Sequence, residues 1–169
     1  VGLGAVEVVL LRVDHRPQIG RPDIRHAHCH GRRDAGDAVE EGPARVEYAN
    51  GAEPLTLFTY KPPTYTDGPL LVVFHGVGRN AEDYRNFAIT MAERFGAIVV
   101  APLFDKERFP LERYQRGGLL DAQNRVQPPE RWTYAAVPRI VTHVREREGK
   151  PAMPYYLVGH SAGGQFLVR

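Results

Sequence analysis

Residues 155–164 read Tyr-Tyr-Leu-Val-Gly-His-Ser-Ala-Gly-Gly, and this stretch decides the fold class of the chain. Its first part, 155–158, is a short apolar run that predicts a buried strand. The residues that follow match the pattern G-x-S-x-G, with Gly159, Ser161 and Gly163 in the fixed positions. This pattern is typical of a sharp turn between a strand and a helix. It predicts an α/β protein in which a helix follows the serine.

The turn explains both the glycines and the serine. It presses the residues two before and two after the serine together, so only glycine-sized residues fit at Gly159 and Gly163. A helix that begins near Ala162 would direct its N-terminal N–H groups and its positive dipole end at Ser161. We therefore predict Ser161 as a nucleophile and the Ala162 N–H as one oxyanion donor. The alternative is a purely structural serine.

A second stretch, 70–78, lies upstream and complements the turn. It begins with Leu-Leu-Val-Val-Phe, a continuous apolar run that predicts a strand covered on both faces. His75-Gly76-Val77-Gly78 follows, where the other oxyanion donor is expected. The glycines let a backbone N–H face the substrate carbonyl, and Val77 is favoured over Gly78 as that donor. We expect His75 to order this loop by hydrogen bonding rather than to catalyse.

Three segments together carry a resemblance to a known family. These segments are the H-G-x-G loop at 75–78, the sequence N-A-E-D-Y at 80–84 and the G-H-S-A-G-G turn at 159–164. Together they resemble the α/β-hydrolase family, and most of all its serine esterases and its polyhydroxyalkanoate-depolymerase-like members. The resemblance covers about 43–169 and only the N-terminal part of that fold. It implies a hydrolase that acts on a small-molecule ester or a polyester through an acyl-enzyme on Ser161, without a cofactor.

The sequence departs from the family in one respect. The family orders its triad as serine, acid and histidine, but none of the 7 histidines follows Ser161. His160 is its neighbour, and neighbouring residues at a strand end project to opposite sides. We therefore expect His160 to support the turn and the acid and the catalytic histidine to lie outside this chain. The 169 residues alone are then expected to be inactive.

Other functions remain open on the same motif. A peptidase, a thioesterase or an acyltransferase would use the same turn, which does not distinguish between acyl donors. A non-catalytic module on a degenerate hydrolase fold is the alternative from a different class. The segment Arg113–Gly118 is a candidate for lining the site entrance, and a solvated loop is the more favoured interpretation of it.

The strands predict a mostly parallel sheet with an N-terminal antiparallel hairpin, as an incomplete α/β-hydrolase fold. The hairpin comprises 44–49 and 55–60, and Asn50-Gly51 between them predicts a type I′ turn. A further buried strand is predicted at 97–101. The strand at 155–158 is expected to form an exposed, aggregation-prone sheet edge.

Two longer helices are predicted between these strands. The first begins with Asn80 as its cap and ends at Gly96. Its predicted buried positions share helical spacing and are Tyr84, Ala88, Met91 and Phe95. A long loop at 102–129 precedes the second helix, which is marked by apolar residues at Trp132, Ala136, Ile140 and Val144. Pro138 is expected to kink or delay that helix.

Residues 1–42 differ from the rest of the chain. All 7 Phe, 8 Tyr and the single Trp lie at position 48 or later, so we expect the packed body to begin near Pro43. The first 42 residues are interpreted as a low-order extension or as upstream sequence translated by mistake. His26, His28 and His30 would share one face of an extended strand and could bind zinc. A composition accident is favoured, because no further ligand follows at a standard finger spacing.

The overall composition excludes several classes. The 22 Lys and Arg nearly balance the 20 Asp and Glu, and a net charge of +2 does not favour nucleic acid. No segment approaches the roughly 20 apolar residues of a membrane span. The opening run Val1–Leu11 carries Glu7 and lacks a basic leader, so a cytoplasmic location is slightly favoured. Neither the compartment nor the oligomeric state is fixed by these features.

Overall fold

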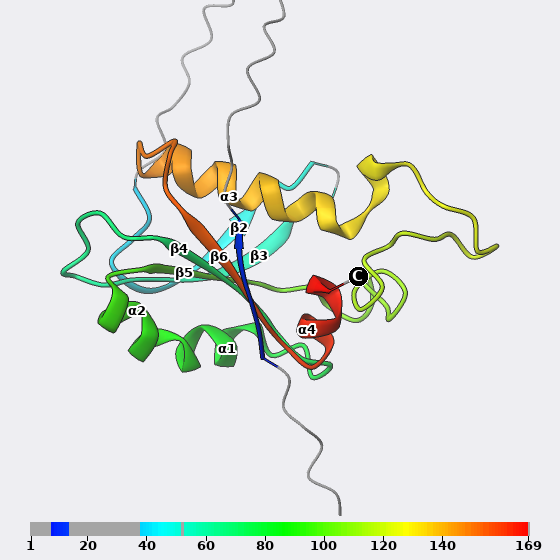
Figure 1. Ribbon diagram of the computed structural model, residues 1–169, viewed down its shortest axis with the longest axis horizontal. Helices are drawn as coiled ribbons and strands as arrows, with labels where there is room; N and C mark the ends of the chain where they lie inside the picture. Colours follow the sequence, from blue (N-terminus) through cyan, green and yellow to red (C-terminus); the bar gives the residue numbers. More distant parts are fainter. Residues whose placement is uncertain (1–7, 14–37, 52, 169) are drawn as a thin grey trace, which may run out of the picture.

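The computed structural model describes residues 8–13, 38–51 and 53–168, and these form a six-stranded sheet flanked by helices (Figure 1). Neighbouring strands follow the order β1-β6-β4-β5-β3-β2. The strands are β1 (Val8–Val13), β2 (Gly42–Tyr48), β3 (Leu55–Lys61), β4 (Leu70–Phe74), β5 (Ile98–Pro102) and β6 (Tyr155–His160). β4 is parallel to β5 and β6, whereas β1–β6, β5–β3 and β3–β2 are antiparallel pairs. The predicted α/β class with its antiparallel hairpin is confirmed, but the described sheet is not mostly parallel, because three of its five strand pairs are antiparallel.

Helices cover both faces of the sheet. They are α1 (Ala81–Phe87), α2 (Ile89–Phe95), α3 (Ala136–Arg147) and α4 (Ala162–Leu167), with short 3-10 helices η1 (Pro129–Arg131) and η2 (Thr133–Ala135) before α3. Figure 1 shows α1 and α2 on one side of the sheet and α3 on the other. No helix in the described ranges is long and apolar enough to cross a membrane.

Strand β4 is buried on both faces, which explains its continuous apolar run. Val72 and Phe74 belong to the core on the side of α3, together with Ile140 of that helix. Leu71 and Val73 belong to the opposite core, beneath α1 and α2. The alternation of side chains along a strand therefore places successive residues of β4 in two separate cores.

Strand β1 corrects two expectations. It pairs antiparallel with β6, with Leu10 opposite Val158, so β6 does not form a sheet edge. Residues 8–13 are thus a strand rather than part of a low-order extension. Val39 is also buried in the core, so the packed body begins before Pro43. The local pattern did not reveal β1 because its partner lies at the far end of the chain.

The hairpin is confirmed, but its turn is not. Tyr48 pairs with Leu55, so residues 49–54 form the connection between β2 and β3. A type I′ turn needs positive φ at both central residues, and of the pair Asn50-Gly51 only Gly51 has it, at 62°. The Glu53 N–H instead donates to the Asn50 carbonyl, so the hydrogen-bonded turn begins one residue later than predicted. Asn50 itself is buried.

The helix predicted between Asn80 and Gly96 is divided at Ala88 into α1 and α2. The Asn80 side chain does not cap a backbone N–H; its amide nitrogen donates to the Asp83 carboxylate at 2.8 Å. Gly96 ends α2 with φ of 56°, as its position predicted.

The buried face of this helix pair also differs from the prediction. Ala88 is buried as predicted, together with other small alanines that face the sheet, but Met91 and Phe95 are exposed. A buried arginine, Arg85, completes that face and donates to the carbonyl of Thr59 at 2.9 Å. The face was misjudged because an arginine occupies a position where an apolar residue was expected. The inward residues are Ala81, Arg85, Ala88 and Ala92.

Helix α3 and the segment before it fit the prediction with two adjustments. Pro138 lies in the first turn of α3, where its missing N–H has no intrahelical partner to lose. The helix is thus delayed, and Trp132 lies before it. The preceding loop is more than a surface connection, because it buries three large aromatic side chains. These are Phe104, Phe109 and Tyr114.

Candidate active site

Ser161 occupies the turn between β6 and α4, and its side chain is exposed. Its backbone has φ 54° and ψ −114°, a conformation that non-glycine residues rarely adopt. Such strain is common where a functional side chain is held in a fixed position. The α4 helix starts directly after it, and the Gln165 N–H donates to the Ser161 carbonyl at 2.9 Å. The geometry is that of the predicted strand-to-helix turn.

Two glycines allow this turn to pack closely. A Cβ atom on Gly159 would lie 2.5 Å from the backbone carbonyl of Gly163. A Cβ atom on Gly163 would lie 2.4 Å from the carbonyl oxygen of Phe74 in β4. Both distances are far inside van der Waals contact. The steric reason inferred from the motif therefore holds at both positions.

The loop at 75–78 lies beside the serine. A Cβ atom on Gly76 would lie 3.7 Å from the Cβ of Ser161, so the two backbones approach closely. The Arg79 N–H donates to the Gly76 carbonyl at 3.2 Å and closes a turn. Within that turn, the N–H groups of Val77 and Gly78 have no hydrogen-bond partner among the described residues. The Val77 side chain is 61% exposed, so the tip of this loop faces solvent.

His75 is fully buried and hydrogen-bonded through both ring nitrogens. Its Nε2 accepts from the Phe104 N–H at 3.1 Å, so its Nδ1 carries the proton and donates to the Gly76 carbonyl at 2.9 Å. Burial lowers the pKa of His75 to about 4. The ring is therefore neutral near pH 7 and joins the loop to the segment after β5. This arrangement matches an ordering role.

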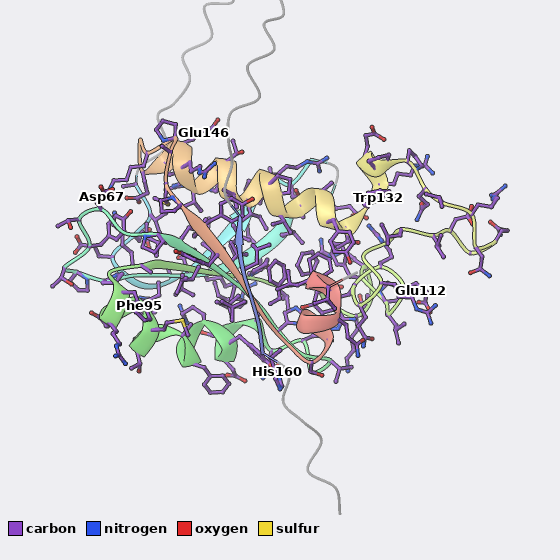
Figure 2. The ribbon with its side chains drawn as sticks, viewed as in Figure 1. Asp67, Phe95, Glu112, Trp132, Glu146 and His160 are labelled. Atoms are coloured by element: carbon purple, nitrogen blue, oxygen red, sulfur yellow. The ribbon has the colours of Figure 1, made fainter. Side chains whose placement is uncertain are left out.

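His160 points toward helix α1. Its Nδ1 lies 2.6 Å from the hydroxyl of Tyr84, and Figure 2 places it at the end of the sheet. A Cβ atom on Gly76 would lie 2.9 Å from that same hydroxyl. Tyr84 thus contacts both the turn and the loop at 75–78. The sequence marked Tyr84 only as an apolar helix position, because a hydroxyl partner that is distant in sequence leaves no local signal.

The segment after β5 supports the loop from behind. Arg79 donates to the carbonyls of Phe104 at 2.6 Å and Phe109 at 2.9 Å, and its guanidinium lies over the ring of Tyr114. The Tyr114 hydroxyl donates to the His75 carbonyl at 2.7 Å. These buried contacts fix the loop in the conformation that exposes its tip.

The segment Arg113–Gly118 adjoins the site framework. Gln115 donates to Gln165 on α4 at 3.0 Å, next to the turn that bears Ser161. Arg113 instead points away and pairs with Glu53 at 2.6 Å. One part of the segment therefore contacts the site framework, while another faces a pocket elsewhere.

None of the described histidines is hydrogen-bonded to Ser161. His75 and His160 have the partners given above, and His143 on α3 packs against the ring of Tyr48. No group of His, Cys, Asp and Glu in the described ranges could hold a metal ion. The candidate zinc ligands lie outside the described residues; they are His26, His28 and His30.

The solved structures that resemble this chain include the two that follow. LpqC, a poly(3-hydroxybutyrate) depolymerase from Bordetella parapertussis, is 42% identical, with a TM-score of 0.69 over 75% of this chain and 45% of that chain. Poly(aspartic acid) hydrolase-1 from Sphingomonas sp. KT-1 is 33% identical, with a TM-score of 0.71 over 76% of this chain and 50% of that one. No protein-family profile and no curated protein matches the sequence.

Both neighbours are α/β-hydrolase-type enzymes, so the resemblance drawn from the sequence is confirmed, and this chain shares their fold over about three quarters of its length. The chain spans half or less of the length of either neighbour. Poly(3-hydroxybutyrate) and poly(aspartic acid) are the polymers named for these two neighbours, each for its own enzyme.

Proposed function

We propose that the protein is a serine hydrolase that cleaves carboxylic esters through an acyl-enzyme on Ser161. The observation that carries the proposal is the strained, exposed Ser161 at the start of α4, beside a loop whose tip keeps its N–H groups unpaired. The hydroxyl would attack the ester carbonyl, and the alcohol would leave as the acyl group becomes bound to Oγ. Water would then release the acid.

The negative charge on the carbonyl oxygen needs donors that are already in place. The Ala162 N–H belongs to the first turn of α4 and is one such donor. Val77 supplies the second in this proposal, and Gly78 is the less favoured alternative. The role of His75 is to hold their loop, and Gly76 lets it approach the serine.

The general base is proposed to lie outside these 169 residues. The family order places the acid and the histidine after the nucleophile, and the described histidines are engaged elsewhere. His160 is bonded to Tyr84 and is assigned a supporting role. Without a base, a serine hydroxyl is a weak nucleophile.

A small-molecule ester or polyester is the proposed substrate, in line with the depolymerase neighbour. Amide hydrolysis is the second candidate, because the other neighbour is named as a poly(aspartic acid) hydrolase. The turn serves either acyl donor equally well. Peptidase, thioesterase and acyltransferase activity use the same geometry, and a non-catalytic module would use none of it.

A fluorophosphonate probe tests the nucleophile. Ser161 is the single serine of the 169 residues, so the chain offers one site for serine labelling. We expect the full-length protein to be labelled and the Ser161→Ala variant not to be. Thr133→Val, which alters a buried hydroxyl elsewhere, is the matched control and should keep the label. A labelled Ser161→Ala variant, or an unlabelled parent protein, would contradict the proposal; p-nitrophenyl esters and anilides then separate ester from amide cleavage.

A further inference from the structure

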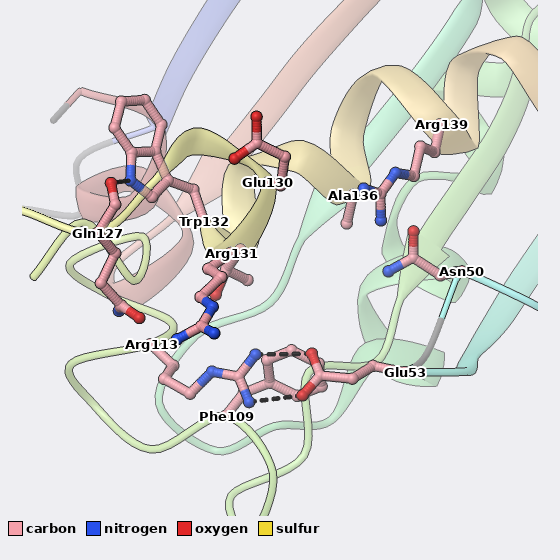
Figure 3. Close-up of a pocket in the computed structure, with 11 residues that line it drawn as sticks. Asn50, Glu53, Phe109, Arg113, Gln127, Glu130, Arg131, Trp132, Ala136 and Arg139 are labelled. Carbon is pink, nitrogen blue, oxygen red and sulfur yellow. Dashed lines mark hydrogen bonds and ion pairs between the residues drawn. The ribbon is translucent and has the colours of Figure 1, made fainter. Parts of the chain in front are cut away.

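A polar pocket with a volume of about 470 Å³ lies away from Ser161 (Figure 3). It is bounded by the β2–β3 connection, the segment after β5, the two 3-10 helices and the start of α3. None of its lining residues belongs to the turn at 159–163 or to the loop at 75–78. Its size is typical of a site for a small organic molecule.

The residues that line this pocket carry more positive than negative charge. Arg113 is neutralised by a two-pronged pair with Glu53, with N–O distances of 2.7 and 2.6 Å. Arg131 and Arg139 also line the pocket, and neither forms an ion pair with any described residue. Glu130 is the remaining acid, and Figure 3 shows its carboxylate directed away from the guanidinium of Arg131. Two guanidiniums are therefore left to meet an anion.

Two buried polar side chains in the wall lack partners. The side-chain oxygens of Asn50 and Thr133 have no hydrogen-bond partner among the described residues, although the two residues are only 7% and 4% exposed. Buried polar atoms are nearly always paired, so two unpaired oxygens among the residues that line one pocket need an explanation. A ligand with polar atoms would supply the missing partners.

The remaining wall is apolar and rigid. Phe109 is 2% exposed, with the Arg113 guanidinium above its ring at 4.9 Å. The indole N–H of Trp132 donates to the carbonyl of Gln127 at 2.7 Å, which fixes the indole. Ala136 at the start of α3 completes this side. These surfaces suit an apolar or aromatic stem.

We propose that this pocket binds an organic carboxylate, attracted by the positive charges of Arg131 and Arg139, with its apolar stem against Phe109 and Trp132. The hydroxyl of Thr133 and the amide of Asn50 lie in the wall to complete the polar contacts. Guanidinium groups bind carboxylates through charge-assisted hydrogen bonds, which are stronger than neutral ones. The proposal does not depend on hydrolase activity.

Trp132 is the single tryptophan of the 169 residues, and a Trp132→Phe variant identifies the part of the fluorescence change that comes from this pocket. The titration uses the Ser161→Ala variant of the full protein, so that acyl transfer plays no part. 4-Phenylbutyrate should give a saturable change, and its uncharged match, 4-phenylbutanamide, should bind at least tenfold more weakly. Arg131→Gln and Arg139→Gln should each weaken binding by about tenfold, which corresponds to the loss of one charged contact.

Arg94→Gln is the matched control, because Arg94 is exposed on α2 and does not line the pocket. It should leave binding of 4-phenylbutyrate unchanged, and melting curves should show that all three glutamine variants are folded. Equal binding of the acid and the amide would overturn the proposal. So would an Arg94→Gln variant that loses as much affinity for 4-phenylbutyrate as the Arg131→Gln and Arg139→Gln variants. If inorganic phosphate bound as tightly as 4-phenylbutyrate, the proposed contact between an apolar stem and the pocket would be wrong.

Discussion

Gly163 leaves no room for a side chain, and this makes a sharp test of the turn. An added Cβ would lie 2.4 Å from the carbonyl oxygen of Phe74, in a strand that cannot shift because both its faces are buried. Gly163→Ala should therefore lower the free energy of unfolding by about 2–4 kcal/mol. Urea unfolding followed by circular dichroism measures the change.

Gly78→Ala is the control for that experiment. Its Cβ would meet only the end of the Asn80 side chain at 3.2 Å, which can rotate away. The free energy of unfolding should change by less than about 1 kcal/mol. If the two alanine variants were equally stable, the inference that α4 packs too closely on β4 to accept a side chain at position 163 would be wrong.

His75 gives the fold a defined dependence on pH. Its pKa is lowered from 6.5 to about 4 by burial, so the unfolded chain binds a proton between these values and the folded chain does not. The contribution of the neutral His75 ring to the free energy of unfolding is complete above pH 6.5 and is lost as the pH falls toward 4. The shift corresponds to about 3 kcal/mol.

The measurement for His75 compares the free energy of unfolding at pH 7.5, 6 and 5 with that of His75→Gln. The glutamine variant should be less stable at pH 7.5 because buried hydrogen bonds are disturbed, and it should show a shallower decline below pH 6.5. Parallel curves for the two proteins would mean that His75 is not held neutral in the folded state.

Strand β1 has a protective role for β6. Its backbone pairs along the whole of β6, from Val8 opposite His160 to Val13 opposite Tyr155. Removing residues 1–13 would leave the N–H and C=O groups of β6 unpaired at an edge, which favours association with other chains. We expect this variant to aggregate at concentrations at which the parent stays soluble, as followed by light scattering and analytical ultracentrifugation.

The matched control removes only residues 1–7 and retains β1. It should behave like the parent protein. A variant without residues 1–13 that remained a soluble monomer would show that β6 does not need this partner.

The contrast between β1 and β4 explains what the sequence could predict about the elements. The buried run at 70–74 and the turn at 159–163 are local features, so pattern and steric argument located both. β1 depends on a partner at the opposite end of the chain, and its apolar run was interpreted without that partner. The face of α1 and α2 was misjudged because Arg85 is buried by bonds to backbone carbonyls of the sheet, which no helical periodicity reveals.

The same distinction applies to the candidate site. Residues of the two motifs were predictable because glycine spacing carries a steric meaning. Tyr84, Arg79 and Tyr114 were not identified as supports, because each acts through partners that the fold brings together. These supports come from α1 and from the segment after β5, so the molecule as a whole builds the loop conformation before any substrate arrives.

That preformed framework leads to a prediction about the whole molecule. The described residues present the proposed nucleophile and unpaired N–H groups beside it, but none of their histidines is hydrogen-bonded to Ser161. The 169 residues alone should therefore hydrolyse p-nitrophenyl acetate no faster than their Ser161→Ala variant. A longer protein that includes the proposed acid and histidine should show a Ser161-dependent rate at least about a thousandfold higher, since loss of a triad member costs that much or more.

Stopped-flow detection of p-nitrophenol separates the outcomes of this comparison. A burst in the longer protein that disappears in its Ser161→Ala variant would indicate an acyl-enzyme. The Thr133→Val variant should keep the burst, because that hydroxyl lies in the wall of the separate pocket. Ser161-dependent turnover by the 169 residues alone would place the base within them, and His160, freed from Tyr84, would then be the first residue to substitute.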